Sequence, residues 1–166
     1  MFKVGMIGLG AMGQGMAINL AKAGFLVTIY NRSTEKAEVL AKTLAVSVSF
    51  TIEELAAQVD IICLCVSRDE DVMAVVSAIA KTIKPNSIVV DMSTVSNHTA
   101  KQAAAILACC DADFLDAPVS GGIEGAKTGN LAMMVGGQAL VLEKVRPVLA
   151  SMAVSYTHLT LPTILL

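Results

Sequence analysis

The sequence predicts an α/β fold with a doubly wound, mainly parallel sheet that carries helices on both faces. Three observations support this prediction. Short apolar segments alternate along the chain with longer segments of helical periodicity. The apolar segments contain few polar residues and end in polar turns, which is typical of strands buried on both faces. The length of 166 residues suits one domain with a sizeable core.

The first half of the chain begins with a strand and continues as alternating helices and strands. Its first helix is supported by Met12, Met16 and Leu20, which recur every fourth residue, and by Gly24, which ends it. A capping box at residues 51–54 opens the third helix. The strands are expected at residues 3–7, 25–30, 46–48 and 60–66, and the helices at residues 11–23, 33–42 and 51–58.

The second half continues the same alternation. A capping box at residues 67–70 opens a helix that runs to residue 81, and the Pro-Asn-Ser sequence of residues 85–87 turns the chain. Further strands are expected at residues 88–91, 113–116 and 131–135, and helices at residues 96–108 and 138–152. Such alternation implies right-handed crossovers and a parallel sheet, although the order of the last strands is left open. Because no linker interrupts residues 1–152, one domain is predicted there.

A glycine motif follows the first predicted strand and opens the first predicted helix. It consists of Gly8, Leu9, Gly10, Ala11, Met12 and Gly13. Gly8 permits a tight turn, Gly10 lets the backbone approach a pyrophosphate, and Gly13 lets the helix pack closely on the sheet. Free N–H groups of residues 8–13 and the positive end of the helix dipole then meet the phosphates. The motif predicts a Rossmann-type dinucleotide-binding domain, and a purely structural turn is the alternative.

The end of the second predicted strand indicates which dinucleotide is preferred. An acidic residue there would bond the ribose 2′-hydroxyl of NAD and repel the 2′-phosphate of NADP. This chain instead has Asn31, Arg32 and Ser33. A guanidinium group suits a phosphate, and the two neighbours can add uncharged hydrogen bonds. The sequence therefore favours NADP(H), with NAD(H) as a second option and a solvated surface arginine as the alternative role of Arg32.

Three further loops lie at the carboxyl ends of predicted strands, where ligands bind in open α/β sheets. The hydroxyl groups of Ser67 and Thr94 can bond a ribose or a nicotinamide amide, or can cap helices instead. In the third loop, glycines at positions 121, 122, 125 and 129 follow Ser120. Successive N–H groups and the Ser120 hydroxyl would suit a carboxylate, and a bulged structural loop is the alternative.

Composition argues against several other classes. The longest apolar runs, such as residues 61–66, are far shorter than the ~18 residues of a membrane-spanning helix. The net charge of −2 gives no basis for binding nucleic acid or an anionic membrane. The cysteines at positions 63, 65, 109 and 110 lack zinc-site spacing, so reduced thiols and no metal are expected. Strand-like residues open the chain in place of a leader, and a cytoplasmic protein is expected.

These motifs resemble those of the β-hydroxyacid dehydrogenase family, which includes 3-hydroxyisobutyrate dehydrogenase, tartronate semialdehyde reductase and glyoxylate/succinic semialdehyde reductase. The resemblance is carried by residues 7–20, 91–94 and 116–131, and it extends over residues 1–152. The related 6-phosphogluconate dehydrogenases have a similar Ser-Gly-Gly but lack the Asp-Ala-Pro of residues 116–118. That branch is therefore a poorer fit.

The resemblance implies an oxidoreductase that transfers a hydride between NADP(H) and a small 3-hydroxy acid or semialdehyde. It implies that Ser120, Gly121 and Gly122 hold the substrate carboxylate, and that Val66, Ser67 and Thr94 contact the cofactor. In this family a lysine beyond the Rossmann domain transfers the proton, on the helix that leads into an all-helical second domain. The full-length protein is expected to be a homo-oligomer.

The sequence departs from the family after Met152. Residues 153–166 contain no glycine and no lysine and match nothing in the family, so they are interpreted as a truncated frame or foreign sequence outside the fold. A lineage-specific tail is the alternative. Lys127, His98 and His158 are poor replacements for the missing lysine. The chain is therefore expected to bind cofactor with little or no turnover. The alternative functions are a non-catalytic NADP(H)-binding module and an enzyme similar to imine reductases or 6-phosphogluconate dehydrogenases.

Overall fold

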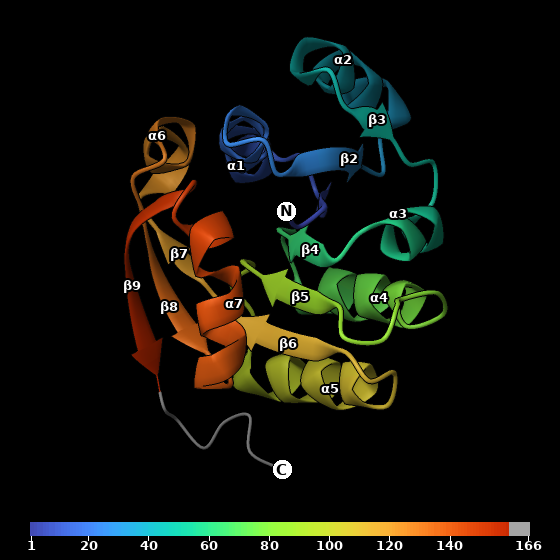
Figure 1. Ribbon diagram of the computed structural model, residues 1–166, viewed down its shortest axis with the longest axis vertical. Coiled ribbons are helices and arrows are strands. Elements are labelled where there is room, and N and C mark those ends of the chain that lie inside the picture. Colours follow the sequence, from blue (N-terminus) through green and yellow to red (C-terminus); the bar gives the residue numbers. More distant parts are fainter. Residues whose placement is uncertain (160–166) are drawn as a thin grey trace.

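The computed structural model describes residues 1–159 and shows a nine-stranded sheet between helices (Figure 1). The strands are β1 (Val4–Ile7), β2 (Leu26–Tyr30), β3 (Ser47–Val48), β4 (Ile61–Leu64), β5 (Ile88–Asp91), β6 (Asp113–Asp116), β7 (Val119–Ser120), β8 (Leu131–Gly136) and β9 (Ala153–Leu159). The helices are α1 (Ala11–Lys22), α2 (Thr34–Leu44), α3 (Ile52–Gln58), α4 (Asp69–Ile79), α5 (Asn97–Ala108), α6 (Gly122–Thr128) and α7 (Ala139–Leu149).

The strand order is β3-β2-β1-β4-β5-β6-β8-β7, and β9 pairs with β8. From β3 to β6 all neighbouring strands are parallel. Strands β2 and β3 follow β1 on one side of the sheet and β4, β5 and β6 follow on its other side, so the strand order reverses between β1 and β4. β8 is antiparallel to β6 and β7 and parallel to β9. This arrangement confirms the predicted doubly wound, mainly parallel fold, and it shows that the parallel order ends after β6.

Two apolar cores lie on opposite faces of the sheet. The division is visible along β4, where Ile61 and Cys63 belong to one core and Ile62 and Leu64 belong to the other. Side chains of α1, α2 and α7 complete the first core, and those of α3, α4 and α5 complete the second. Because both faces of β4 are covered, its sequence is apolar at consecutive positions, which is the pattern that predicts a parallel sheet.

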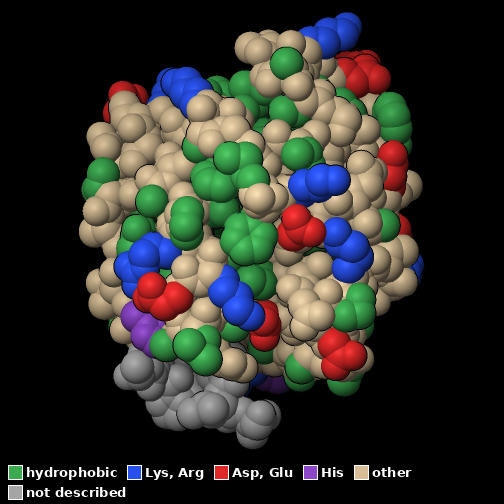
Figure 2. Space-filling view, viewed as in Figure 1, with side chains coloured by type: hydrophobic (Ala, Val, Ile, Leu, Met, Phe, Trp, Pro, Cys, Tyr) green, Lys and Arg blue, Asp and Glu red, His purple; other side chains and the backbone are tan. Residues whose placement is uncertain are grey.

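The exposed surface carries charges of both signs. On the face seen in Figure 2, lysine and arginine side chains are interspersed with aspartate and glutamate, and hydrophobic side chains lie between them. Within residues 1–159, no helix combines the length and the apolar character that crossing a membrane requires.

The segment after Asp116 contains more regular structure than the sequence predicts. Residues 117–130 are expected to form a glycine-rich loop, but they contain the short strand β7 and the helix α6. Gly121 (φ +133°) and Gly122 (φ +63°) form the turn between them, and Gly129 (φ +71°) ends the helix. The glycines at these three positions therefore serve backbone conformations that other residues rarely adopt.

The segment after Met152 also differs from the prediction. The sequence predicts that residues 153–166 lie outside the fold, whereas residues 153–159 form β9 at the edge of the sheet. His158 Nε2 lies 2.9 Å from the Gly137 carbonyl oxygen, and the Arg146 guanidinium lies over the Tyr156 ring. The domain boundary predicted at residue 152 is thus wrong for these seven residues. The rest of the predicted tail, residues 160–166, lies outside the described residues.

Candidate functional site

A pocket of about 480 Å³ opens at the carboxyl ends of β1, β2 and β4. Of the residues predicted to bind a cofactor, those that line it are Gly8, Leu9, Gly10, Asn31, Arg32, Ser33, Val66 and Ser67. Those that do not line it are Ala11, Met12, Gly13 and Thr94. The structure therefore brings together segments that are far apart in the sequence, as expected at the carboxyl edge of a sheet of this topology.

Each glycine of the motif has a different environment. Gly8 adopts φ +92°, and a Cβ there would lie 2.0 Å from the Cys65 carbonyl oxygen. A Cβ on Gly13 would lie 2.0 Å from the Gly8 carbonyl oxygen, so α1 packs directly on the loop. A Cβ on Gly10 would meet no atom within 4 Å. Gly8 and Gly13 are thus required by the fold itself, whereas Gly10 borders the open pocket.

The backbone N–H groups of this loop are only partly available. Gly8 N donates to the Tyr30 carbonyl, and Leu9 N donates to Asn31 Oδ1 at 3.0 Å. Residues 10–13 form no hydrogen bond through their N–H groups to any other part of residues 1–159. The prediction that all of residues 8–13 offer free amides is therefore wrong for the first two, which hold the loop in place. Four amides remain at the start of α1, where the helix dipole is positive.

Asn31 bonds protein atoms at the pocket that it lines. Its Oδ1 accepts from Leu9 N, and its Nδ2 donates to the Ser33 carbonyl at 3.2 Å. The side chain thus connects the end of β2 to the glycine loop. Both polar atoms of this side chain bond protein atoms, so Asn31 orders the pocket wall that it also lines, and one N–H of its Nδ2 remains for a ligand.

The pocket wall after β2 carries two cations. Arg32 was predicted from the sequence, and Lys36, one turn into α2, lines the same pocket. Lys36 can be found from the sequence, because helical side chains point toward the helix N-terminus and α2 starts beside Arg32. Asp71 also lines the pocket, but its carboxylate bonds Arg68 through two oxygens at 3.2 Å. Arg68 first, and also the charge of Arg32, lower the pKa of Asp71, so this carboxylate is paired mainly with Arg68 while Arg32 and Lys36 line the pocket as cations.

The hydroxyl groups of Ser67 and Thr94 are not used as helix caps. The N-cap of α4 is Arg68, which makes no side-chain cap bond, and the N-cap of α5 is Ser96. Ser67 and Thr94 are both exposed. Capping, the alternative role for these two residues, is therefore wrong. Ser93 is different, because it is buried and its hydroxyl accepts from Val66 N at 2.9 Å.

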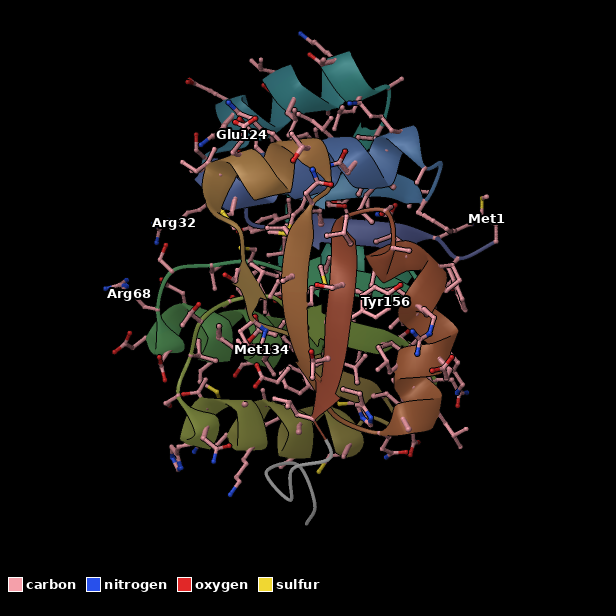
Figure 3. The ribbon with its side chains drawn as sticks, turned by 90° about the vertical axis from the view of Figure 1, so that its left-hand side faces the viewer. Met1, Arg32, Arg68, Glu124, Met134 and Tyr156 are labelled. Carbon is pink, nitrogen blue, oxygen red and sulfur yellow. The ribbon has the colours of Figure 1, made fainter. Side chains whose placement is uncertain are left out.

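The predicted substrate residues lie at the start of α6. Ser120 ends β7 and is exposed, Gly121 is the N-cap of α6, and Gly122 is its first residue. None of the three lines the 480 Å³ pocket. Figure 3 shows α6 starting at the edge of the molecule where Arg32 and Arg68 lie, with Met1 at the opposite edge. The start of α6 therefore shares the carboxyl edge with the pocket.

Helix α6 is held against the glycine-motif helix by its backbone. A Cβ on Gly15 would lie 2.7 Å from the Ala126 carbonyl carbon. Asn19 Nδ2 donates to the carbonyl oxygens of Ala126 at 2.7 Å and Lys127 at 3.3 Å. These bonds satisfy carbonyls at the end of α6 that the helix itself cannot satisfy. The free amides lie at the start of α1, and Ser120, Gly121 and Gly122 lie where β7 passes into α6. The packing of α6 on α1 therefore fixes the free amides and the predicted substrate residues relative to each other.

Replacing Asn19 by alanine should lower the free energy of unfolding by about 1–2 kcal/mol, because carbonyl oxygens of α6 lose their donor. Urea denaturation would measure this loss. Gln14→Ala on the same helix is a matched control, since the side-chain amide of Gln14 makes no hydrogen bond within residues 1–159 and its backbone N–H bond to the Gly10 carbonyl is kept. Equal stability of the Asn19→Ala variant and the wild type would show that Asn19 does not hold α6.

Two aspartates lie side by side beneath this edge. Asp91 and Asp116 occupy paired positions at the ends of the parallel strands β5 and β6. Asp91 is fully buried, its Oδ1 accepts from Ser93 N at 2.9 Å, and its Oδ2 bonds no atom of residues 1–159. Burial raises the pKa of each carboxyl to about 6. The sequence shows that both strands end in aspartate, but only the register shows that the two are neighbours.

The sequence is similar to a family of NAD binding domains and to dehydrogenases. The family model described as the NAD binding domain of 6-phosphogluconate dehydrogenase matches residues 3–160. The 2-(hydroxymethyl)glutarate dehydrogenase of Eubacterium barkeri is 38% identical over 160 residues, which are 94% of this chain and 52% of that protein. The chain spans about half the length of the curated relatives it matches.

Solved structures resemble this chain over almost its whole length. The 3-hydroxyisobutyrate dehydrogenase of Mycobacterium tuberculosis, solved with L-serine, has a TM-score of 0.91 and 33% identity, covering 95% of this chain and 54% of that one. Psf3 in complex with NADP+ and 2-OPP has a TM-score of 0.87 and 31% identity, covering 96% of this chain and 57% of that one.

Proposed function

This chain belongs to the β-hydroxyacid dehydrogenase family through its NAD(P)-binding domain, and on that premise we propose that it binds NADP(H) in the 480 Å³ pocket. Two features of the described residues support the proposal: four unbonded amides at the start of α1, where Gly10 lines the pocket, and two cations, Arg32 and Lys36, along the pocket wall. The amides suit the diphosphate, and the cations suit a 2′-phosphate.

The residues at the start of α1 suit the diphosphate of a dinucleotide. N–H groups of residues 10–13 form the first turn of α1 and bond nothing else in residues 1–159. The open space beside Gly10 would be filled by any side chain there. The backbone N–H of Leu9, the residue before Gly10, donates to Asn31 Oδ1, so the loop keeps its shape before the ligand binds. A preformed loop of this kind reduces the entropy lost on binding.

The residues of the pocket wall after β2 suit the 2′-phosphate of NADP. Arg32 and Lys36 line the pocket after β2, and no acidic residue occupies the position that would bond a ribose 2′-hydroxyl. The one carboxylate of this wall, Asp71, is bonded to Arg68. The NADP+ bound by Psf3, which is 31% identical to this chain, gives independent support for NADP.

The proposed reaction of the whole protein is hydride transfer between NADP(H) and a small 3-hydroxy acid or semialdehyde. The bound nicotinamide supplies or accepts the hydride. Ser67 and Thr94 are proposed to bond the cofactor, and Ser120, Gly121 and Gly122 are proposed to hold a substrate carboxylate with hydroxyl and backbone donors. The names of the relatives, a 3-hydroxyisobutyrate dehydrogenase and a 2-(hydroxymethyl)glutarate dehydrogenase, support this substrate class.

The proton transfer that accompanies the hydride needs an acid–base group, and neither Lys127 nor Lys36 of the described residues 1–159 is proposed for this role. Lys127 lies in the last turn of α6, at the end of that helix away from Gly122. Lys36 lies beside Arg32, at the proposed 2′-phosphate end. We therefore propose that residues 1–166 bind the cofactor with little or no turnover, and that the proton-transferring lysine belongs to the second half of the full-length enzyme.

Arg32→Ala should weaken NADPH binding by about ten- to a hundredfold, because a charge-assisted contact is worth about 1.5–3 kcal/mol. Affinity for NADH, which lacks the 2′-phosphate, should change little. Both affinities can be measured by titration followed through nicotinamide fluorescence. Arg146→Ala is the control, since Arg146 bonds Glu143 on α7, away from the pocket. An Arg32→Ala variant with wild-type NADPH affinity would show that the 2′-phosphate assignment is wrong.

A further inference from the structure

The loops that follow the neighbouring strands β4 and β5 are joined to each other at two places. Close to the sheet, Val66 N donates to Ser93 Oγ at 2.9 Å. Close to the helices, Asp69 Oδ2 accepts from Ser96 N at 3.1 Å, from Ser96 Oγ at 2.6 Å and from Thr99 Oγ1 at 2.7 Å. Each loop is thus tied to the other both where it leaves its strand and where it enters its helix.

We propose that Asp69 and Ser93 are positioning residues that hold these two loops as one unit, so that Ser67 and Thr94 reach a bound dinucleotide in a fixed relative placement. The role of the ligand in this proposal rests on the proposed function. Asp69 and Ser93 do not line the pocket, and Ser93 is 2% exposed. They act through Val66 and Ser67, which do line it.

The bonds of Asp69 are not ordinary helix capping. The first turn of α4 contains the acidic residues Asp69, Glu70 and Asp71. Asp71 bonds Arg68 within the same turn, and only Asp69 bonds another helix, 27 to 30 positions away in sequence. The Ser96 hydroxyl is the first of the hydrogen bonds that lower the pKa of Asp69, so the carboxylate stays ionised at neutral pH. One charged oxygen therefore joins the starts of α4 and α5.

The bond from Val66 N to Ser93 Oγ, the tie closer to the sheet, continues the hydrogen bonding of the sheet beyond the strands. Met92 N donates to the Leu64 carbonyl at 2.8 Å, which extends the backbone pairing of β4 with β5 by one step. At the next step the Ser93 hydroxyl replaces the backbone as acceptor for Val66 N. Asp91 Oδ1 accepts from Ser93 N at 2.9 Å and thereby orients that residue. The two chains thus stay paired past the point where the strands end.

Holding the loops together has a consequence for binding. If each loop moved independently, a ligand that touches both would have to order each one, and each ordering costs entropy. With both ties in place, the placement of Ser67 relative to Thr94 is set before the ligand arrives. Loss of one tie should therefore weaken binding even though no contact to the ligand is removed.

The test compares Asp69→Ala with Glu70→Ala, which removes an exposed acid from the same helical turn without removing a tie. Amide hydrogen exchange of the ligand-free proteins should be faster in Asp69→Ala at residues 66–68 and also at residues 93–97, and unchanged in Glu70→Ala. NADPH affinity should fall about five- to tenfold in Asp69→Ala, the scale of one lost hydrogen-bonded tie. Asp69→Asn, which keeps an acceptor oxygen at this position, should restore most of both effects.

Two results would overturn the proposal. One is exchange at residues 93–97 that does not respond to Asp69→Ala, since the loops would then move independently. The other is an equal loss of NADPH affinity in Glu70→Ala, since the effect would then come from the charge of the α4 terminus. If the wild type binds no NADPH, the proposed function fails, and the exchange data alone decide whether the loops form one unit. Ser93→Ala offers a second variant, with faster exchange expected at Val66.

Discussion

Gly13→Ala is expected to lower the free energy of unfolding by about 3 kcal/mol and the Tm by roughly 6–12 °C, whereas Gly10→Ala leaves both unchanged. A Cβ on Gly13 would lie 2.0 Å from the Gly8 carbonyl oxygen, and backbone atoms there cannot move aside without displacing α1. A Cβ on Gly10 meets nothing within 4 Å, and its φ of −67° suits any residue.

The same two variants separate folding from nucleotide binding. The methyl group that Gly10→Ala introduces would occupy the space beside the free amides, so NADPH affinity should fall by about tenfold or more despite unchanged stability. Thermal unfolding and NADPH titration of both variants check the two effects. A Gly10→Ala variant that binds NADPH like the wild type would contradict the placement of the diphosphate against residues 10–13. A fully stable Gly13→Ala variant would contradict the packing of α1.

Sequence patterns predict the first part of this fold well because burial on both faces leaves a strong signal. Segments such as residues 60–66 are apolar at consecutive positions, and the structure places β4 between two cores. The segment after β6 is harder to predict. Glycines at positions 122 and 125 in α6 and at its C-cap, position 129, suggest a loop, but Gly125 is buried and Ala126 packs against the Gly15 backbone. Tertiary contact there overrides helix propensity.

The candidate site was predictable where a motif carries its own geometry, as in the glycine loop after β1. It was not predictable where side chains from distant segments bond one another. Asn31 is an example, because its Oδ1 accepts a hydrogen bond from Leu9 N, which lies 22 positions away in the sequence. Asp69 is another, because its partners Ser96 and Thr99 follow a different strand. Such pairings depend on strand register, which residue types alone do not reveal.

Replacing the buried acid Asp91 by asparagine is expected to make the protein more stable than the wild type at pH 8. Burial raises the pKa of this carboxyl from its ordinary 3.8 to about 6, so the folded protein binds the proton more tightly than the unfolded chain. The contribution of Asp91 to the free energy of unfolding should therefore fall as the pH rises from about 4 to 6 and then stay low. This difference in pKa corresponds to about 3 kcal/mol.

Asparagine keeps the acceptor for Ser93 N and removes the charge, while its new amide nitrogen lacks a partner where Asp91 Oδ2 already lacks one. The net gain at pH 8 should be about 1–2 kcal/mol, with little difference from the wild type at pH 4. Urea denaturation at pH 4, 6 and 8 measures both values. Asp113→Asn, at the opposite end of β6 from Asp116, is the control and should not change the pH dependence. If Asp91→Asn is less stable than the wild type at pH 8, the carboxylate stabilises the fold through its neighbours, and the paired ends of β5 and β6 tolerate a charge that burial alone would disfavour.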